Sequence, residues 1–475
     1  MKQLFHVVII GGGIAGLSTA YYLQQQAPGR GLSYTLLEGA SAWGGKIQTR
    51  VEAGFVIEGG PDSFITQKPA ALRLCRELGL EDQLQGTNDA QRKVYVLHAG
   101  RLRSLPDGVM LVIPTKFTPF VFSPLISLPG KLRMGMDLFI PRRNGDGDES
   151  LADFIRRRLG REALDKIAEP LMSGIHVSDA ERQSIRGTFP RFVELERKYG
   201  SLIKGMLAQK ALARQHPGPR LPVFMTLRGG LGQLVQALVA RLSGELRLNA
   251  QVVRLERLPA STSQTRAGYR LYLADGQSLL ADAVVLATPA FTAAELVESF
   301  RPELAGRLRA IRHVSTATLS LAFARAGFEH PLDGFGFVVP RREPCQLMAC
   351  TWTSTKFEGR APQDYVLIRA FVGGPHRQEL VDLDDATLIA LVRDELRRVM
   401  GIRKPPAMTW LYRWPQANPQ YDVGHLERVD EIERLAASLP GLYLTGSAYR
   451  GVGIPDCIEQ GKAVAEKIVS DSALG

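Results

Sequence analysis

Apolar runs separated by glycine-rich turns open the chain. Residues 4–10 are apolar and β-branched, as is typical of a parallel strand that is buried on both faces. Glycine-rich residues follow at 11–16, and a helical pattern then continues to about Gln26, where a proline and a glycine stop it. A second apolar run at 34–37 ends on Glu38. This order predicts a strand, a tight turn, a helix and a second strand.

Helical and strand patterns alternate along the rest of the chain. Residues 69–78 have the leucine spacing of an amphipathic helix, and helical patterns dominate from Ser150 to about Gln215. A helix is expected over 233–242, and strands are expected over 246–258, 269–273, 283–286, 318–323, 336–339, 347–352 and 366–371. The chain closes with a strand at 442–444, a glycine-rich turn and a helix from about Ile458 to Val469. Since this ending repeats the opening arrangement, both ends are expected to return to one domain.

The glycine-rich turn has the spacing of a dinucleotide-binding fingerprint. Gly11, Gly13 and Gly16 form G-x-G-x-x-G after a buried strand, and Glu38 closes the next strand about 20 residues later. The glycines permit a tight turn, a close approach of the backbone to a pyrophosphate, and close packing of the helix. The start of the helix, at Ile14 and Ala15, stabilises phosphate charge. A carboxylate at the ribose would repel a 2′-phosphate, which argues against NADP.

Paired glycines elsewhere favour FAD over NAD. Gly44, Gly45 and Lys46 follow the second strand, and Gly60 with Pro61 comes soon after, where an NAD domain has no need of such turns. Near the C-terminus, a further turn and helix start would contact the pyrophosphate or the flavin ring. The cofactor contacts expected outside the first turn are Gly44, Gly45, Lys46, Gly60, Pro61, Val253, Thr288, Gly446, Gly453, Ile454 and Pro455.

These patterns predict an α/β fold in three units. The first is a Rossmann-type FAD-binding domain over 1–65, 225–265 and 430–475. The second is an α+β substrate-binding domain over 66–105 and 266–429. The third is a helical insertion over 106–224. With 475 residues, the chain is long enough for two or three such units.

Composition narrows the class of protein. Apolar residues make up 45% and charged residues 23%, which is typical of a soluble globular protein rather than a disordered one. The four cysteines are scattered without a C-x-x-C pair, and no histidine pair has the spacing of a helical metal site. We expect a reducing compartment, no disulfide framework and no metal. The first residues run directly into a strand, so we expect no signal peptide and a cytoplasmic protein.

A net charge of +11 leaves several partners open. Lysine and arginine are spread along the chain rather than clustered with aromatic residues, so nucleic acid is not expected. A basic solvated surface is the simplest interpretation, followed by a polyanionic small substrate and then by an anionic membrane surface. The apolar stretch 108–130 is interrupted by Pro114, Pro119, Pro124 and Pro129, which excludes a continuous helix. It is either an ordered loop that caps a pocket or a surface that docks peripherally on lipid.

The same motifs carry a resemblance that spans the chain. GGGIAGLSTAYYL, LLEGASAWGGKIQT and IEGGPDSF resemble the FAD-binding entry of the porphyrinogen oxidases, and LYLTGSAYRGVGIPDCIEQGKAVA resembles their closing segment. Between them, IPTKFTPF, EPLMSGIHVSDAERQSIRGTFP, LRGGLGQL, GFGFVVP and ACTWT occur in the family's order. The entry motifs are shared with amine oxidases and carotenoid desaturases, whereas the later blocks resemble the bacterial coproporphyrinogen-oxidising type. Gln48 stands where some relatives have arginine.

The resemblance implies an activity. It implies a six-electron aromatisation of a porphyrinogen in haem synthesis, in which FAD takes hydride and O2 reoxidises the flavin to give H2O2. Coproporphyrinogen III is the favoured substrate, and protoporphyrinogen IX remains an alternative. A flavin amine oxidase or desaturase and a non-enzymatic carrier are the competing classes. The implied partners are the porphyrinogen, O2, the inner face of the membrane and other haem-synthesis enzymes.

The resemblance also implies substrate-contacting residues. Lys68 and Arg92 would hold propionates, Phe335, Phe337 and Met348 would wall the macrocycle, and Gly174 would let the backbone approach it closely. No Ser-His-Asp, Cys-His or carboxylate-pair arrangement is evident, so catalysis is expected to depend on the flavin and on orientation. His176 is expected to be structural. The competing interpretation is that the cations are solvated and that the aromatic residues belong to the core.

Overall fold

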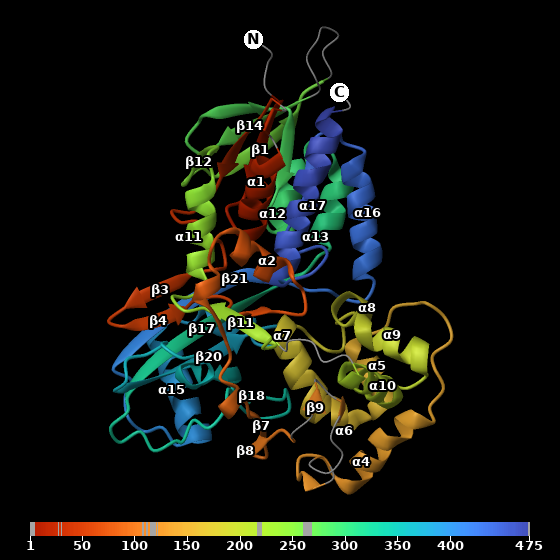
Figure 1. Ribbon diagram of the computed structural model, residues 1–475, viewed down its shortest axis with the longest axis vertical. Helices are drawn as coiled ribbons and strands as arrows, with labels where there is room; N and C mark the ends of the chain where they lie inside the picture. The colour runs from red at the N-terminus through yellow and green to blue at the C-terminus, as the bar shows by residue number, and fades with distance from the viewer. Residues whose placement is uncertain are drawn as a thin grey trace.

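The computed structural model describes residues 5–26, 28–29, 31–106, 109–110, 113–114, 120, 122–215, 221–259 and 268–473. In Figure 1, a parallel sheet with its helices forms the upper part of the molecule. A large second sheet lies at the lower left, and a group of helices lies at the lower right.

Five parallel strands form the sheet of the upper part. Their order is β12-β2-β1-β16-β22, so strands from both ends of the chain lie side by side. The strands are β1 (Phe5–Ile10), β2 (Leu32–Leu37), β12 (Glu245–Arg247), β16 (Ala283–Leu286) and β22 (Leu442–Leu444). Alternate residues of β1 enter two separate cores: Val7 and Ile9 belong to one, and Val8 and Ile10 to the other. The uninterrupted apolar run is therefore explained by burial on both faces.

Different elements cover the two faces. The first face packs against α1 (Ile14–Gln26), α2 (Ala70–Glu77), α11 (Gly232–Arg241) and α17 (Ile454–Ala473). The second packs against an antiparallel sheet of β13 (Val252–Arg257), β14 (Tyr269–Leu273) and β15 (Ser278–Ala281), and against α12 (Ala290–Val297), α13 (Pro302–Arg309) and α16 (His425–Ala437). The expected division at residue 266 assigned 269–309 to the substrate-binding domain. Because β16 is a central strand of the parallel sheet, we place this boundary near Arg312 instead.

The second sheet has seven strands in the order β21-β17-β20-β19-β18-β7-β8. They are β7 (Val94–His98), β8 (Arg101–Ser104), β17 (His313–Ala324), β18 (Gly336–Val338), β19 (Leu347–Thr351), β20 (Tyr365–Gly373) and β21 (Met408–Pro419). One face packs on α15 (Asp385–Met400) through Leu388, Val392 and Leu396. Short elements join the two sheets: β3 (Thr49–Glu52), β4 (Phe55–Glu58), β5 (Phe64–Ile65), β6 (Leu84–Gly86), β11 (Phe224–Leu227) and α14 (Thr353–Lys356).

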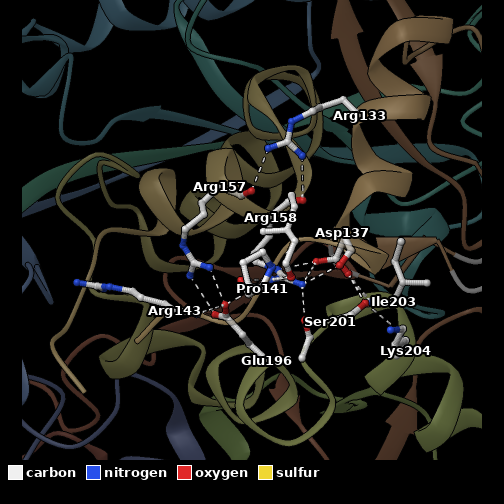
Figure 2. A network of polar contacts seen from close by, with 12 residues as sticks. Arg133, Asp137, Pro141, Arg143, Arg157, Arg158, Glu196, Ser201, Ile203 and Lys204 are labelled. Atoms are coloured by element: carbon white, nitrogen blue, oxygen red, sulfur yellow. Dashed lines mark hydrogen bonds and ion pairs between the residues drawn. The ribbon is translucent and has the colours of Figure 1, made fainter. Parts of the chain in front are cut away.

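The helical part of the chain surrounds a buried ion pair. Its elements are β9 (Val109–Met110), β10 (Ile113–Pro114), α4 (Leu128–Gly135), α5 (Leu151–Leu159), α6 (Arg161–Ala163), the π-helix η4 (Leu164–Ser173), α7 (Gly174–His176), α8 (Ile185–Thr188), α9 (Pro190–Tyr199) and α10 (Leu202–Gln215). Figure 2 shows Arg158, which is fully buried and donates to Asp137 at 2.6 Å, while Ser201 donates to the other oxygen of that carboxylate at 2.6 Å. These bonds satisfy charges whose burial would otherwise be costly.

The secondary structure expected from the pattern is largely present, with instructive differences. The C-terminal helix begins at Ile454 rather than Ile458, since a helix tolerates proline at its second residue, Pro455. In the same way, Pro129 lies in the first turn of α4, so the proline-rich stretch ends in a helix. Pro119 lies outside the described residues.

Candidate functional site

The turn after β1 is shaped by glycines that have no room for a side chain. Gly11 has φ +110°, and a Cβ on Gly16 would lie 1.9 Å from the Gly11 carbonyl oxygen. At Gly13, by contrast, a Cβ would meet no described atom within 4 Å. The turn thus packs tightly on its protein side and leaves space next to Gly13, at the start of α1. This arrangement suits a phosphate group.

Glu38 is held in place at the end of β2. Its carboxylate accepts hydrogen bonds from the backbone N–H of Gly12 at 2.7 Å and of Ala40 at 2.8 Å. The carboxylate is therefore attached to the fingerprint turn itself. A ribose contact by Glu38 stays a prediction.

A second turn pairs with the first. The Gly44 N–H donates to the Gly12 carbonyl at 2.8 Å, and Gly45, with φ +56°, lies against the Cα of Gly13. Gly60 continues this contact, because a Cβ there would lie 1.8 Å from the Lys46 carbonyl oxygen. The predicted cofactor segments 44–46 and 60–61 are thus brought together around the fingerprint.

Lys46 occupies an unusual environment between these turns. Its Nζ donates to the Ala417 carbonyl at 2.9 Å and to Ser447 Oγ at 3.2 Å. Burial lowers the pKa of Lys46, although the side chain has solvent-accessible atoms. Burial, helped by the nearby Lys46 charge, lowers the pKa of His313 to about 4, so this imidazole is neutral at pH 7.

The backbone of Gly59 is anchored by the second sheet. Its carbonyl accepts hydrogen bonds from Thr318 Oγ1 at 2.8 Å, Trp414 Nε1 at 2.9 Å and Arg369 Nη2 at 3.1 Å. Arg369 also donates to the Gly60 carbonyl. Strands β17, β20 and β21 thereby hold the 59–61 segment against Lys46. Sequence reasoning missed these three donors, because each is distant from Gly59 in the chain.

The C-terminal turn contributes the remaining predicted cofactor segment. A Cβ on Gly446 would meet no described atom within 4 Å, and the Gly453 N–H donates to Asp456 Oδ2 at 3.2 Å at the start of α17. Thr445 Oγ1 and Thr288 Oγ1, at the ends of β22 and β16, are buried without a hydrogen-bond partner in the described part of the chain. Unpaired buried hydroxyls are costly, and a polar cofactor would satisfy them. These observations fit a bound flavin nucleotide.

Val253 lies near the start of β13. It is exposed and stands at an irregularity in the pairing of β13 with β14, between Val252 and Arg254. The Ala250 N–H donates to the Glu38 carbonyl at 2.8 Å, which ties the start of β13 to the fingerprint. Contact of Val253 with the cofactor stays a prediction.

The predicted substrate residues fall into different environments. Met348 approaches Gly374 and Val177, next to α7, and Gly174 has open space beside its Cα. Phe335 is half-buried. Phe337 is only 2% exposed and packs in the core between the second sheet and α15, so we no longer assign it to a substrate wall. Phe337 therefore fits the competing interpretation from the sequence, in which the aromatic residues belong to the core and not to a substrate wall.

The two predicted cations also differ. Lys68 makes an ion pair with Asp456 at 2.7 Å, so it is not free to hold a propionate without exchanging that partner. Arg92 is exposed and forms no ion pair with any residue that the structure describes. His176 contacts Phe189 edge-on, and burial lowers its pKa to about 4. His176 is therefore neutral at pH 7, in agreement with a structural role.

Two further chemistries receive no support. In the described ranges, no three His, Cys, Asp or Glu side chains gather in a way that could hold a metal ion. Burial raises the pKa of Cys457 to about 12, so the cysteine next to Lys46 and Asp456 is a protonated thiol at pH 7. A thiol in that state is a poor nucleophile.

The fold and the turns define an FAD-containing oxidoreductase, and the chain belongs to the family of flavin containing amine oxidoreductases, whose model matches residues 14–469. Within that family, it is 40% identical to a coproporphyrinogen III oxidase from Bacillus subtilis (strain 168), covering 96% of both chains. It is 36% identical to a coproporphyrinogen III oxidase from Staphylococcus aureus (strain NCTC 8325 / PS 47), over 98% of this chain and 99% of the relative. Protoporphyrinogen oxidase 1 of Arabidopsis thaliana chloroplasts is 29% identical, over 95% and 86%.

Solved structures agree on the fold. A crystal structure of a protein from Exiguobacterium sp. 255-15 matches with a TM-score of 0.86 and 34% identity, covering 98% of this chain and 99% of the other. A putrescine oxidase structure matches with a TM-score of 0.70 at 16% identity, which shows the fold alone. The expected amine-oxidase-like flavoprotein architecture and the relationship to porphyrinogen oxidases are confirmed.

Proposed function

We propose that this protein oxidises coproporphyrinogen III to coproporphyrin III, with O2 as the electron acceptor. The observation that carries the proposal is the 40% identity, along nearly the whole of both chains, to a coproporphyrinogen III oxidase. A bound flavin accepts hydride from carbon and passes electrons to O2. The residues of this chain then have two tasks, to hold that cofactor and to orient a flat macrocycle with four carboxylates.

The environment of Lys46 supports the first task. Segments 11–13, 44–46, 59–61 and 446–453 would enclose the cofactor with backbone amides, and Lys46 would place one desolvated cation between them. The nearby His313 and the thiol of Cys457 are uncharged at pH 7, so neither would offset the charge of Lys46.

The surface around α7 supports the second task. A Cβ on Gly174 would meet no described atom within 4 Å, and a Cβ on Gly374 would lie 2.8 Å from Met348 and 3.5 Å from Val177. Arg92 has no competing carboxylate in the described structure, so it is the better of the two predicted cations for a propionate. Orientation of a rigid ring against the flavin would supply most of the catalytic effect.

The test is a fluorescence assay under air and under argon. We expect porphyrin fluorescence to rise faster than in the protein-free control only with protein, FAD, coproporphyrinogen III and O2 together, with H2O2 as a second product. The matched variants are Gly13→Ala, which fills the proposed phosphate space, and Gly306→Ala, which lies on the surface of α13 with an equally open Cβ position. G13A should lose FAD and activity, whereas G306A should keep both. Fluorescence no faster than the protein-free control would refute the proposal.

Protoporphyrinogen IX is the second candidate substrate. A relative with that name in its description is 29% identical, against 36% and 40% for the coproporphyrinogen III oxidases. The kcat/KM values for the two porphyrinogens, measured on one preparation, discriminate the candidates. A higher value for protoporphyrinogen IX would reverse the assignment.

We also propose peripheral contact with an anionic membrane surface. No helix among the described residues has the length and apolar character needed to cross a membrane. However, Leu128, Leu132, Met136 and Phe139 follow helical spacing along α4 and just beyond it, and all are exposed, Phe139 by 84%. Phe122, 81% exposed, lies nearby in the chain. An exposed apolar stripe on a protein of net charge +11 favours an anionic lipid surface.

Vesicle co-sedimentation tests this contact. The double variant Phe122→Ser/Phe139→Ser should bind vesicles containing anionic phospholipid several-fold more weakly than the parent. Leu280→Thr is the control, since Leu280 is also an exposed apolar residue but lies on β15 in the upper part. Equal loss in both variants, or no binding by the parent, would contradict the proposal.

A further inference from the structure

Tyr421 lies just after β21 and reaches the predicted flavin turn with its hydroxyl group. The side chain is buried, with 3% exposure. Its hydroxyl donates to the Ser447 carbonyl at 2.8 Å and accepts from the Gly451 N–H at 2.8 Å. One hydroxyl therefore joins two points of the 446–453 turn. Without it, the N–H of the half-buried Gly451 would lose its partner.

The ring of Tyr421 packs against His425, which also forms a hydrogen bond to the 446–453 turn. It stacks on His425, with ring centroids 3.7 Å apart and planes inclined by 14°. His425 Nε2 lies 2.9 Å from the Tyr449 carbonyl, and because a carbonyl only accepts, Nε2 carries the proton. Burial lowers the pKa of His425 to about 4, so the ring is neutral and this hydrogen bond persists at pH 7. Ser447, Tyr449 and Gly451 are thus all held from one side.

The backbone of the same segment is attached to the other units of the molecule. The Tyr421 carbonyl accepts from the Ser184 N–H at 2.7 Å. Asp422 forms ion pairs with Arg182 at 2.9 Å, in the helical part, and with Arg312 at 2.8 Å, just before β17. The segment 421–425 therefore has anchors outside the turn that it holds.

We propose that Tyr421 is a positioning residue, whose hydroxyl holds the 446–453 turn in the shape that receives FAD. The inference rests on the FAD site described above. Thr445 and Gly446 offer the cofactor an unpaired hydroxyl and open space only while the turn keeps this shape. Tyr421 itself touches the turn and need not touch the cofactor.

The test compares two hydroxyl deletions that are matched in chemistry. Y421F removes the hydroxyl that bridges the turn and retains the stacked ring. Y34F is the control: it removes a buried hydroxyl that likewise donates one hydrogen bond, to Gln24 Oε1 at 2.7 Å, and accepts one, from the Gly244 N–H at 3.1 Å, but this hydroxyl lies on β2, outside the 446–453 turn. The measurements are the dissociation constant for FAD on the apoprotein, the visible circular dichroism of bound flavin, and hydrogen exchange of the Gly451 amide.

We expect Y421F to weaken FAD binding about tenfold, to change the flavin spectrum and to speed exchange at Gly451, since two hydrogen bonds to the turn are lost. Y34F should stay within about twofold of the parent in all three measurements, because the two hydrogen bonds that it loses lie outside the turn. If Y421F binds FAD as tightly as the parent, with an unchanged spectrum, the positioning role is refuted and the cofactor assignment stands. A parent protein that takes up no FAD would overturn the cofactor assignment as well.

Discussion

The proposed site has a nucleotide side, around Gly13, and a macrocycle side, around Gly174, and different parts of the chain form the two sides. On the proposed nucleotide side, glycines and backbone amides of the turns at 11–13, 44–46, 59–61 and 446–453 form the surface, and local sequence shapes each turn. On the proposed macrocycle side, the candidate residues come from α7, from β19 and from the segment before β7, which are far apart in the chain. The first kind of site depends on local backbone geometry. The second kind of site depends on which side chains pack into a core. Phe337 is buried, for example, whereas Phe335, two residues earlier, is only half-buried.

The largest loss of stability is expected at Phe337, which was predicted to form the substrate wall together with Met348. Phe337→Ala should cost about 3–5 kcal/mol of unfolding free energy, because a core aromatic leaves a cavity. Met348→Ala should cost less stability and raise KM for the porphyrinogen, since Met348 is only half-buried. Urea unfolding and initial rates measure both quantities. A stable Phe337→Ala variant with a raised KM would return Phe337 to the substrate wall.

On the nucleotide side, Gly16→Ala should destabilise by about 1–3 kcal/mol and abolish FAD binding, because the added Cβ meets a backbone oxygen at 1.9 Å. Gly13→Ala should reduce FAD binding while leaving the apoprotein as stable as the parent. Thermal unfolding of the two apoproteins makes the distinction. Equal destabilisation would mean that the space beside Gly13 is not reserved for a ligand.

A pH effect is expected close to the macrocycle side. Burial raises the pKa of Glu169, in the π-helix that ends at Ser173, to about 7 from 4.5. A raised folded-state pKa favours the protonated form, so its contribution is complete below pH 4.5 and is lost as the pH rises through 7. Glu169→Gln should therefore flatten the dependence of stability on pH and gain about 1–3 kcal/mol at pH 8. An unchanged pH profile would show that Glu169 is solvated.

The smallest stability effect concerns Lys68. Its pair with Asp456 is half-exposed, so Lys68→Met should cost only about 0–1 kcal/mol. If Lys68 serves solely to pair with Asp456, KM stays unchanged in this variant. If it exchanges partners to hold a propionate, KM rises in Lys68→Met and falls in Asp456→Asn. Steady-state kinetics with coproporphyrinogen III decides between the two roles.

The fingerprint turn, the strand after it, and the closing strand and helix could be predicted because each signal is local. The spacing of Gly11, Gly13 and Gly16 predicts a turn. Because β1 is buried on both faces, its sequence is an uninterrupted apolar run. The same locality explains why FAD could be named from the sequence.

Other features were beyond prediction because their partners lie far away in the chain. Nothing near Gly59 indicates that Thr318, Arg369 and Trp414 will bind its carbonyl, and nothing near Ser447 points to Tyr421. The burial of Phe337, the pairing of Lys68 with Asp456 and the place of β16 in the parallel sheet likewise depend on how the sheets pack. Local sequence determines the backbone conformation and the shape of the turn proposed to accept a phosphate. Only long-range packing decides which side chains are accessible and which distant residues hold them in place.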